Sequence, residues 1–357
     1  MKITIVGGGN IGTQFAVHCA QKNDVTIFTS KPEEFSTTIR IVDENDNLVL
    51  EGKNIKSTND LDEAFLDCDM IFVTYPAFSM DDISKKISSY ARKNLLIGIV
   101  PGTGGGECAF KESIDKGAIV FGIQRVPSVA RVVEKGRCVR AIGYREELYV
   151  ASLPNRESIR IANIIENIFK IKTNALPNYL NLTLTPSNPI LHTTRLKTIF
   201  KDYHDGVKYD SLPLFYEDWN DETSELLFKC DDEVQKICKS LRNFDLSYVK
   251  SLKDHYESDT PAKLTKKIKS IQWFKWLKTP SIKTDKGLIP DFNSRYFTAD
   301  FSFGLSILIQ IWDFLKLDIK NLKETMNRYR RLSKDDEFSF REYGIDNLNE
   351  FNNIYFL

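Results

Sequence analysis

Three polar side chains in the second half of the sequence have the types needed for proton transfer and carboxylate binding: His192, Arg295 and Asp300. The imidazole of a histidine gains and loses a proton near neutral pH, so His192 could act as a general acid or base. A guanidinium binds a planar carboxylate through two parallel hydrogen bonds, which a lysine cannot do as well. A carboxylate can hold an imidazole in one orientation and stabilise its charged form.

His192 differs from the other histidines by its position. It lies one turn into an expected helix whose first turn includes Pro189, just beyond the boundary that we expect between two domains. The other histidines of the chain fall within an expected helix of the first domain or in polar stretches: His18, His204 and His255. A purely structural role is the alternative for His192.

Arg295 and Asp300 lie in one segment, residues 290–305, which is rich in aromatic side chains. A carboxylate that is buried beside such an apolar surface must be paired. Its partner could be a histidine, which would make Asp300 part of a reactive site. Its partner could instead be Arg295, which would give an ion pair with no further function.

A second set of residues, near the N-terminus, has the spacing of a phosphate-binding turn. The motif G-x-G-x-x-G at residues 7–12 follows the apolar run 3–6 and precedes a helical pattern at 13–21, and the apolar run 25–28 closes a β-α-β unit. The glycines permit a tight turn, a close approach of the backbone to a pyrophosphate and close packing of the helix on the strand. The motif therefore predicts dinucleotide contacts by Gly7, Gly9, Asn10, Ile11 and Gly12.

The end of the second expected strand indicates which nicotinamide cofactor is bound. An acidic residue there would hydrogen-bond the ribose 2′-hydroxyl of NAD, but this sequence has Thr29, Ser30 and Lys31. Two hydroxyls and an ammonium suit a 2′-phosphate, so the sequence favours NADP(H) over NAD(H). Glu33 and Glu34 follow closely and could still serve NAD(H).

Two further segments follow apolar runs of strand length. Tyr75 and Pro76 end one run, and Gly102 and Thr103 end the next, in a loop rich in glycine. Residues just past the carboxyl ends of the strands face the cofactor in a doubly wound sheet. Glycines allow the backbone to pass close to a ligand. We therefore expect all four residues to contact the cofactor.

The remaining pattern divides the chain into two domains that position these residues. Residues 1–183 alternate strand-length apolar runs with helical patterns, which predicts a Rossmann-type α/β domain with a doubly wound sheet. Residues 184–357 have few glycines and apolar residues three or four apart, which predicts an all-α domain. Other expected elements are a hairpin at 39–50, a strand pair at 139–152, and helices at 224–241, 246–252 and 305–322.

The composition excludes several functional classes. The 49 basic residues equal the 49 acidic ones, so the chain lacks the surplus of Lys and Arg that a nucleic-acid binder needs. No apolar run reaches the ~18 residues that span a bilayer, so no membrane is expected as a partner. The apolar stretch after Lys2 breaks at Gly7-Gly8-Gly9, so we expect no export signal, and the six cysteines form no C-x-x-C pair. We therefore expect a cytoplasmic protein with free thiols and no metal site.

Six motifs together resemble the octopine/nopaline (opine) dehydrogenase family. In chain order they are Gly7–Gly12, Tyr75-Pro76-Ala77, Gly102-Thr103-Gly104-Gly105, Ser187-Asn188-Pro189 with His192, Phe215-Tyr216-Glu217-Asp218-Trp219, and Arg295–Leu305. The last motif departs from the family's usual pattern at Ala299, where an acidic residue is common, and at Ser302, where a proline is common. Both departures leave the functional groups in place but could reshape a substrate pocket.

The resemblance implies a fold similar to that of the glycerol-3-phosphate and 6-phosphogluconate dehydrogenases. It also implies an NAD(P)H-dependent reductive condensation, in which an α-keto acid and the amino group of an amino acid form an imine that is reduced to a secondary amine. In this reaction His192 would be the acid and base, Asp300 its orienting partner, and Arg295 the group that binds a substrate carboxylate. The family includes monomers and dimers, so a homodimer is compatible with the resemblance.

Two other functions stay open at this point. A ketopantoate-type or other simple 2-keto acid reductase would use no amine, but such enzymes typically rely on a lysine base, and no lysine is placed like His192. A catalytically silent NADP-binding regulatory protein would not need His192, Arg295 and Asp300 together. Aromatic residues of the second domain could line a substrate pocket or pack in the core: Tyr216, Trp219, Trp273 and Trp276.

Overall fold

The computed structural model describes residues 1–185, 187–333 and 337–357 and divides the chain into two compact units. Unit 1 comprises Met1–Thr183 and Phe351–Leu357, and unit 2 comprises Leu184–Glu350. The sequence-based division had placed all residues after 183 in the second domain. Residues 351–357 instead pack with unit 1, where the Leu357 carbonyl accepts a hydrogen bond from the Asn155 backbone amide at 2.8 Å.

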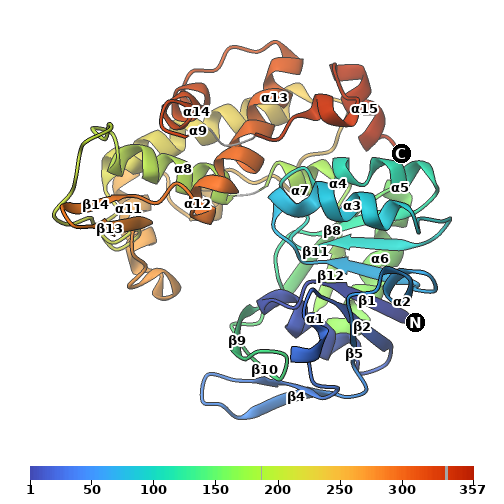
Figure 1. Ribbon diagram of the computed structural model, residues 1–357. Coiled ribbons are helices and arrows are strands. Elements are labelled where there is room, and N and C mark those ends of the chain that lie inside the picture. Colours follow the sequence, from blue (N-terminus) through green and yellow to red (C-terminus); the bar gives the residue numbers. More distant parts are fainter. Residues whose placement is uncertain (186, 334–336) are drawn as a thin grey trace. The chain divides into compact units, whose positions relative to one another are not determined.

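An eight-stranded sheet forms the centre of unit 1 (Figure 1). Its strands are β1 (Lys2–Val6), β2 (Asp24–Phe28), β5 (Lys56–Thr58), β6 (Met70–Val73), β7 (Leu96–Ile99), β8 (Ile119–Ile123), β11 (Glu147–Leu153) and β12 (Lys172–Ala175). They are ordered β12-β11-β8-β7-β6-β1-β2-β5. All neighbours pair in parallel except β11 and β8, which are antiparallel.

Helices cover both faces of this sheet, as the strand sequences require. Side chains along the strands alternate between two buried clusters, so that Ile5 and Phe72 belong to one and Val6 and Val73 to the other. A strand that is apolar on both sides must be covered on both faces. The first cluster includes residues of α1 (Asn10–Cys19) and α6 (Ser158–Phe169), and the second those of α2 (Leu61–Phe65), α3 (Met80–Ser88) and α5 (Lys111–Asp115). Two short helices complete unit 1, α4 (Gly106–Ala109) and α7 (Leu180–Thr183). The predicted Rossmann-type domain is confirmed.

A smaller sheet packs beside α1 and holds the strands β3 (Ile39–Val42), β4 (Leu48–Gly52), β9 (Val129–Glu134) and β10 (Cys138–Ile142). The predicted hairpin is β3 and β4, which pair antiparallel. The predicted strand pair at 139–152 is wrong, because its two strands lie in different sheets. β10 pairs with β3 and with β9, while β11 pairs with β8 and β12.

Unit 2 is helical, as predicted, and carries one additional β-hairpin, β13 (Ser281–Thr284) and β14 (Gly287–Pro290). Its helices are α8 (Ser187–Ile199), α9 (Asp221–Ser240), α10 (Leu252–His255), α11 (Pro261–Ser270), α12 (Arg295–Thr298), α13 (Ser306–Leu315) and α14 (Asn321–Arg330). A last helix, α15 (Leu348–Tyr355), begins in unit 2 and ends in unit 1. Among the described helices, none combines the length and apolarity that crossing a membrane requires.

Two helical predictions in unit 2 are wrong. Residues 246–251 form no helix, and the apolar side chains of Leu246 and Val249 are buried although their backbone is not helical. Helix α10 begins after Ser251, whose hydroxyl caps the helix by accepting a hydrogen bond from the Asp254 amide. The predicted helix 305–322 is interrupted after α13, where Lys316 adopts a left-handed φ of 52°. A carboxylate from a distant helix, Glu233, accepts hydrogen bonds from backbone amides at the start of α14 and so fixes where that helix begins.

Candidate functional site

The predicted cofactor contacts lie at one edge of the large sheet. β7, β6, β1 and β2 are neighbours and run parallel, so their carboxyl ends meet at the same edge. The segments that follow these four ends are Gly102–Thr103, Tyr75–Pro76, Gly7–Gly12 and Thr29–Lys31. The fold of unit 1 therefore brings together all the residues that the sequence predicted to contact a cofactor.

The three motif glycines have the geometry that a pyrophosphate requires. Gly7 has a φ of +105°, in the left-handed region that side chains disfavour. A Cβ at Gly12 would lie 1.8 Å from the Gly7 carbonyl oxygen, so only glycine lets α1 pack this closely on the turn. Above Gly9 there is open space, with no atom within 4 Å of a Cβ built there. This open space at the N-terminus of α1 fits a phosphate group.

Asn10 and Ile11 contribute to this turn with their backbone rather than their side chains. The Asn10 Oδ1 accepts a hydrogen bond from the Val132 amide at 2.7 Å, and Ile11 packs against the core of unit 1. Their backbone N–H groups lie in the first turn of α1, where a helix provides no internal partner. These N–H groups are therefore available for an anion.

Two lysines lie near the end of β2. Thr29 is buried, whereas Ser30 and Lys31 are exposed. Lys31 Nζ lies 3.3 Å from Glu34 Oε1, and Lys135, which the sequence analysis did not single out, pairs with the same carboxylate. Hydrogen bonding from Lys135, with a further contribution from Lys31, lowers the pKa of Glu34. Two ammonium groups thus share the carboxylate of Glu34, and the exposed carboxylate of Glu33 follows Lys31 by two residues.

The close packing at Gly12 leads to a prediction about the cofactor turn. Gly12→Ala is expected to lower the melting temperature of the cofactor-free protein by several degrees, because overpacking typically costs about 1–3 kcal/mol. Gly9→Ala is the matched variant, since its Cβ meets no atom within 4 Å, and it should leave the melting temperature unchanged while weakening cofactor binding. Differential scanning calorimetry checks both. Equal melting temperatures for Gly12→Ala and the unchanged protein would contradict the packing described here.

The reactive side chains are assembled within unit 2. His192 lies in α8, and Asp300 directly precedes a π-helical turn at Phe301–Leu305. A Cβ at Gly304 in this turn would lie 2.6 Å from a side-chain carbon of Pro189, so the glycine lets the turn approach α8. The imidazole Nδ1 of His192 consequently lies 2.7 Å from Oδ2 of Asp300.

The other ring nitrogen of His192 also has a partner. Its Nε2 lies 2.7 Å from the hydroxyl oxygen of Tyr216, and the imidazole is only 8% exposed. With an ionised Asp300 accepting from Nδ1–H, the neutral imidazole accepts a hydrogen bond from Tyr216 at Nε2. Burial, with a smaller contribution from the charge of Asp300, raises the pKa of both Tyr216 and Tyr296. The site is therefore a largely desolvated imidazole held at both nitrogens.

Arg295 does not pair with Asp300. It begins α12, is exposed, and its guanidinium makes no hydrogen bond or ion pair with the residues that the structure describes. The ion pair between Arg295 and Asp300, which the sequence left as an alternative, is thus absent from the described residues, and Asp300 is paired with His192. The guanidinium is available for an anionic ligand.

Sequence reasoning missed the part played by Arg195. Its side chain is 2% exposed and donates to the backbone carbonyls of Phe215 at 2.8 Å, Asp218 at 2.9 Å and Leu214 at 3.2 Å. It thereby fixes the segment 214–218, which presents Tyr216 to His192. The sequence feature that could have indicated this role is the position of Arg195, which follows His192 by three residues, about one turn along the same helix.

The aromatic residues named as candidate pocket residues have different surroundings. Trp219 is 2% exposed and packs in the core of unit 2, whereas Trp276 is 77% exposed. The side chain of Trp273 and the residue Pro186 lie outside the described part of the chain. Neither Trp219 nor Trp276 therefore stands as evidence for a substrate pocket.

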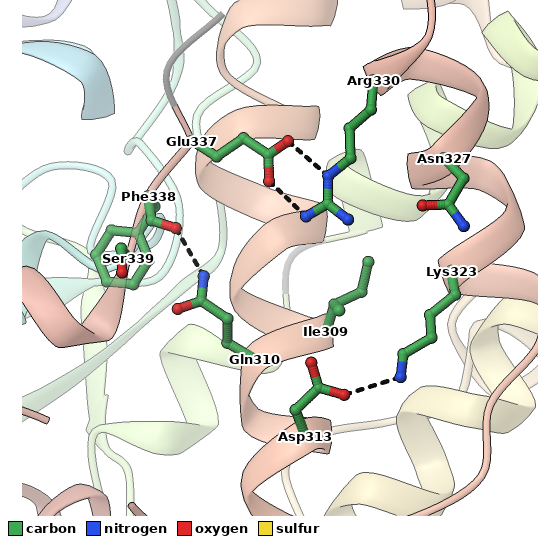
Figure 2. A pocket seen from close by; sticks show the side chains of 9 residues that line it. All are labelled: Ile309, Gln310, Asp313, Lys323, Asn327, Arg330, Glu337, Phe338 and Ser339. Carbon is green, nitrogen blue, oxygen red and sulfur yellow. Dashed lines mark hydrogen bonds and ion pairs between the residues drawn. The ribbon is translucent and has the colours of Figure 1, made fainter. Parts of the chain in front are cut away.

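A hollow elsewhere on unit 2 is a weaker candidate site. Its volume is about 460 Å³, and Figure 2 shows that its charged side chains face one another. Lys323 pairs with Asp313 at 2.8 Å and Arg330 with Glu337 at 2.7 Å, so these charges are already satisfied. Within the described residues no group of three or more His, Cys, Asp or Glu side chains could hold a metal ion.

Comparisons with known proteins match both units. Residues 175–333 match the family described as NAD/NADP octopine/nopaline dehydrogenase, alpha-helical domain, and residues 2–109 match the N-terminus of NAD-dependent glycerol-3-phosphate dehydrogenase. Octopine dehydrogenase from Pecten maximus is 24% identical over 340 residues, covering 86% of this chain and 84% of that protein. Opine dehydrogenase from Haliotis discus hannai is 26% identical over 344 residues, with the same coverage of 86% and 84%.

A solved structure supports the fold over nearly the whole chain. Octopine dehydrogenase with NADH and L-arginine superposes with a TM-score of 0.85 at 18% identity, covering 98% of this chain and 97% of that one. This similarity confirms the predicted combination of a Rossmann-type sheet and a helical domain.

Proposed function

Because this chain belongs to the octopine/nopaline (opine) dehydrogenase family of NAD(P)-dependent dehydrogenases that act on amino-group substrates, we propose that it condenses an α-keto acid with the amino group of an amino acid and reduces the product. One observation supports this most strongly. His192 is held by Asp300 at 2.7 Å in the same unit as Arg295, which has no partner among the described side chains.

His192 is the acid and base in this proposal. Converting a carbonyl and an amine into an imine releases water, so a proton must reach the oxygen that leaves. The imidazolium of His192 provides it, and the carboxylate of Asp300 stabilises that imidazolium through Nδ1–H. The neutral imidazole that remains can accept a proton when the reaction runs in reverse.

Arg295 binds a substrate carboxylate in this proposal. Both an α-keto acid and an amino acid carry a carboxylate at pH 7, and an exposed guanidinium can grip it through two hydrogen bonds. This contact would fix the substrate close to the segment that carries Asp300. A dinucleotide whose pyrophosphate is bound at the glycine turn of unit 1 would supply the hydride from its nicotinamide.

We further propose that the cofactor is NADP(H) rather than NAD(H). Support comes from the ammonium groups of Lys31 and Lys135, which both pair with Glu34, and from the neighbouring hydroxyls of Thr29 and Ser30. A 2′-phosphate would be attracted to this charge, whereas the 2′-hydroxyl of NAD(H) would gain less from it.

Lys31→Glu tests the cofactor preference. It is expected to weaken NADPH binding by about 10–100-fold, because a charge-assisted hydrogen bond is typically worth ~1.5–3 kcal/mol, and to change NADH binding by less than about threefold. Fluorescence titration of both cofactors measures this. Lys53→Glu is the matched control, because Lys53 is an exposed lysine of unit 1 away from the end of β2. Equal losses for the two cofactors would refute a role in binding the 2′-phosphate.

A coupled-substrate assay tests the reaction class. Oxidation of NADPH and NADH is followed at 340 nm with an α-keto acid alone, with amino acids alone, and with both together. Oxidation that requires both substrates supports the condensation. Oxidation with the keto acid alone would indicate a simple reductase, and no oxidation with any pair would favour a regulatory protein.

A further inference from the structure

We propose that Glu107 is a positioning residue for the cofactor, because its carboxyl group holds the loop 102–106 to two other segments of unit 1. This loop follows β7 and contains Gly102 and Thr103, which we expect to contact the cofactor. The inference rests on the cofactor binding that we propose for unit 1 and does not depend on which substrates are condensed.

The loop 102–106 lies on the nicotinamide side of the expected cofactor site. In a doubly wound sheet the dinucleotide lies across the carboxyl ends of the strands, with its pyrophosphate at the turn after β1 and a ribose beside the end of β2. β7 lies on the other side of β1 from β2, with β6 between β7 and β1. The loop after β7 is therefore placed to contact the nicotinamide half of the molecule.

This loop is rich in glycine and is anchored at both ends. Gly104 and Gly105 have left-handed φ values of 80° and 72°, and glycines leave a free loop many other conformations. At one end the Gly102 amide donates a hydrogen bond to the Ile123 carbonyl at 2.8 Å. At the other end the loop leads into α4, where the side chain of Glu107 is 0% exposed. The Glu107 carboxyl group therefore fixes the end of the loop that leads into α4.

Two hydroxyl groups donate hydrogen bonds to the same oxygen of Glu107. The Thr183 hydroxyl donates to Oε1 at 2.6 Å, and the Tyr355 hydroxyl donates to Oε1 at 2.8 Å. Both donor side chains are buried, so water does not easily replace either of them. The carboxyl group is thereby connected to α7, which contains Thr183, and to α15, which contains Tyr355.

The two donors lie beside the places where the chain passes between its units. Thr183 is the last residue of unit 1 before the chain enters unit 2 at Leu184, and Tyr355 belongs to the segment 351–357 that returns to unit 1. A carboxyl group that binds both donors therefore holds the unit 1 ends of both connections to the cofactor loop.

Glu107 makes these contacts as a neutral acid. Burial raises the pKa of its carboxyl group and outweighs the hydrogen bonds from Thr183 and Tyr355, which lower it. Its Oε2 atom is buried and has no hydrogen-bond partner among the described residues, so a negative charge would be uncompensated there. Burial also raises the pKa of the neighbouring Cys108 thiol and Tyr355 hydroxyl, so these groups are neutral as well. A neutral carboxyl group still accepts both hydrogen bonds at Oε1.

Removing both donors tests the inference. Thr183→Val/Tyr355→Phe keeps the approximate shape of both side chains and is expected to weaken the binding of NADPH and of NADH by about tenfold or more, as the loss of two hydrogen bonds allows. At saturating cofactor, kcat should stay within about threefold, because the reactive side chains lie in unit 2. Fluorescence titration and steady-state kinetics measure the two effects.

Tyr149→Phe is the matched control for the double variant. It removes another hydrogen bond between a tyrosine and a glutamate of unit 1, from Tyr149 to Glu147 at 2.9 Å, and should leave the affinity for both cofactors unchanged. Cofactor dissociation constants of Thr183→Val/Tyr355→Phe within about threefold of the original values would overturn the proposal.

Substitution of Glu107 itself tests the neutral state. Glu107→Gln keeps an uncharged acceptor oxygen, so the cofactor dissociation constants should stay within about threefold of their original values. Glu107→Ala removes the acceptor and should weaken cofactor binding by about tenfold or more. If the glutamine variant lost as much affinity as the alanine variant, a neutral carboxyl group could not be what holds the loop. The double variant keeps the inference testable if Glu107→Ala folds poorly.

Hydrogen–deuterium exchange followed by mass spectrometry reports on the loop directly. In the cofactor-free protein, amides of residues 102–108 should exchange faster in Thr183→Val/Tyr355→Phe than in the unchanged protein, whereas those of β1 should not. Unchanged exchange in the loop would contradict its attachment through Glu107, and faster exchange with unchanged cofactor affinity would leave the contact structural and refute the positioning role. Because neither exchange nor titration uses a substrate, a protein that shows both effects but no condensation would retain this inference while the proposed function fails.

Discussion

His192→Ala is expected to lower kcat for the condensation by about 10²–10⁴-fold, the usual contribution of a general acid or base. The dissociation constants of NADPH and NADH should stay within about threefold of their original values. The reason is that His192 lies in unit 2, whereas the glycine turn and the end of β2 lie in unit 1. Steady-state kinetics and a fluorescence titration of each cofactor measure the two effects separately.

His204→Ala is the control for this experiment. His204 is also in unit 2 but is exposed, and its Nδ1 is hydrogen-bonded to the backbone carbonyl of Asp205. It should retain full activity. A His192→Ala variant with kcat close to that of the control would remove His192 from the mechanism, and thermal unfolding of both variants excludes misfolding as the cause of a loss.

Asp300→Asn is expected to have an effect of comparable size, a loss of about 10³–10⁴-fold in kcat, as in hydrolases whose orienting carboxylate becomes an amide. The carboxylate accepts from Nδ1–H at 2.7 Å and stabilises the imidazolium. An amide is neutral and can donate to Nδ1, which would move the imidazole proton to Nε2. The ¹⁵N spectrum of His192 should therefore report the change of tautomer along with the loss of activity.

Asp291→Asn is the matched control for the loss of one carboxylate in the same segment. Asp291 accepts from the Asn293 amide at 3.1 Å and does not contact His192. Its activity should stay within about threefold of that of the unchanged enzyme. If Asp300→Asn were equally active, the short contact with His192 would be structural and the assignment of Asp300 would fail.

The cofactor edge of unit 1 could be predicted because its signals are local. Gly7, Gly9 and Gly12 lie within one turn, and strands that are buried on both faces appear as short apolar runs. Right-handed β-α-β connections then limit the orders that parallel strands can take in the sheet. His192 and Asp300 could be singled out as candidate partners because a buried carboxylate requires a partner, and few residue types can pair with it.

The features that could not be predicted depend on contacts between distant segments. β10 pairs with β3 and β9 rather than with β11, and the small sheet that these strands form packs beside α1. The start of α14 is fixed by Glu233, more than eighty residues earlier in the sequence. In the same way Tyr216 contacts His192 from a segment that Arg195 holds through backbone carbonyls. The partners in these contacts lie twenty or more residues apart, so local spacing does not pair them.

The most direct test of the account follows the hydride into the product. The enzyme is incubated with pyruvate, a panel of amino acids and NADPH or NADH carrying deuterium at the transferred position, and the products are analysed by mass spectrometry. We expect a secondary amine that joins the two substrates and carries one deuterium. Deuterated lactate formed at the same rate with and without amino acids would contradict the condensation and with it the roles assigned to His192 and Asp300.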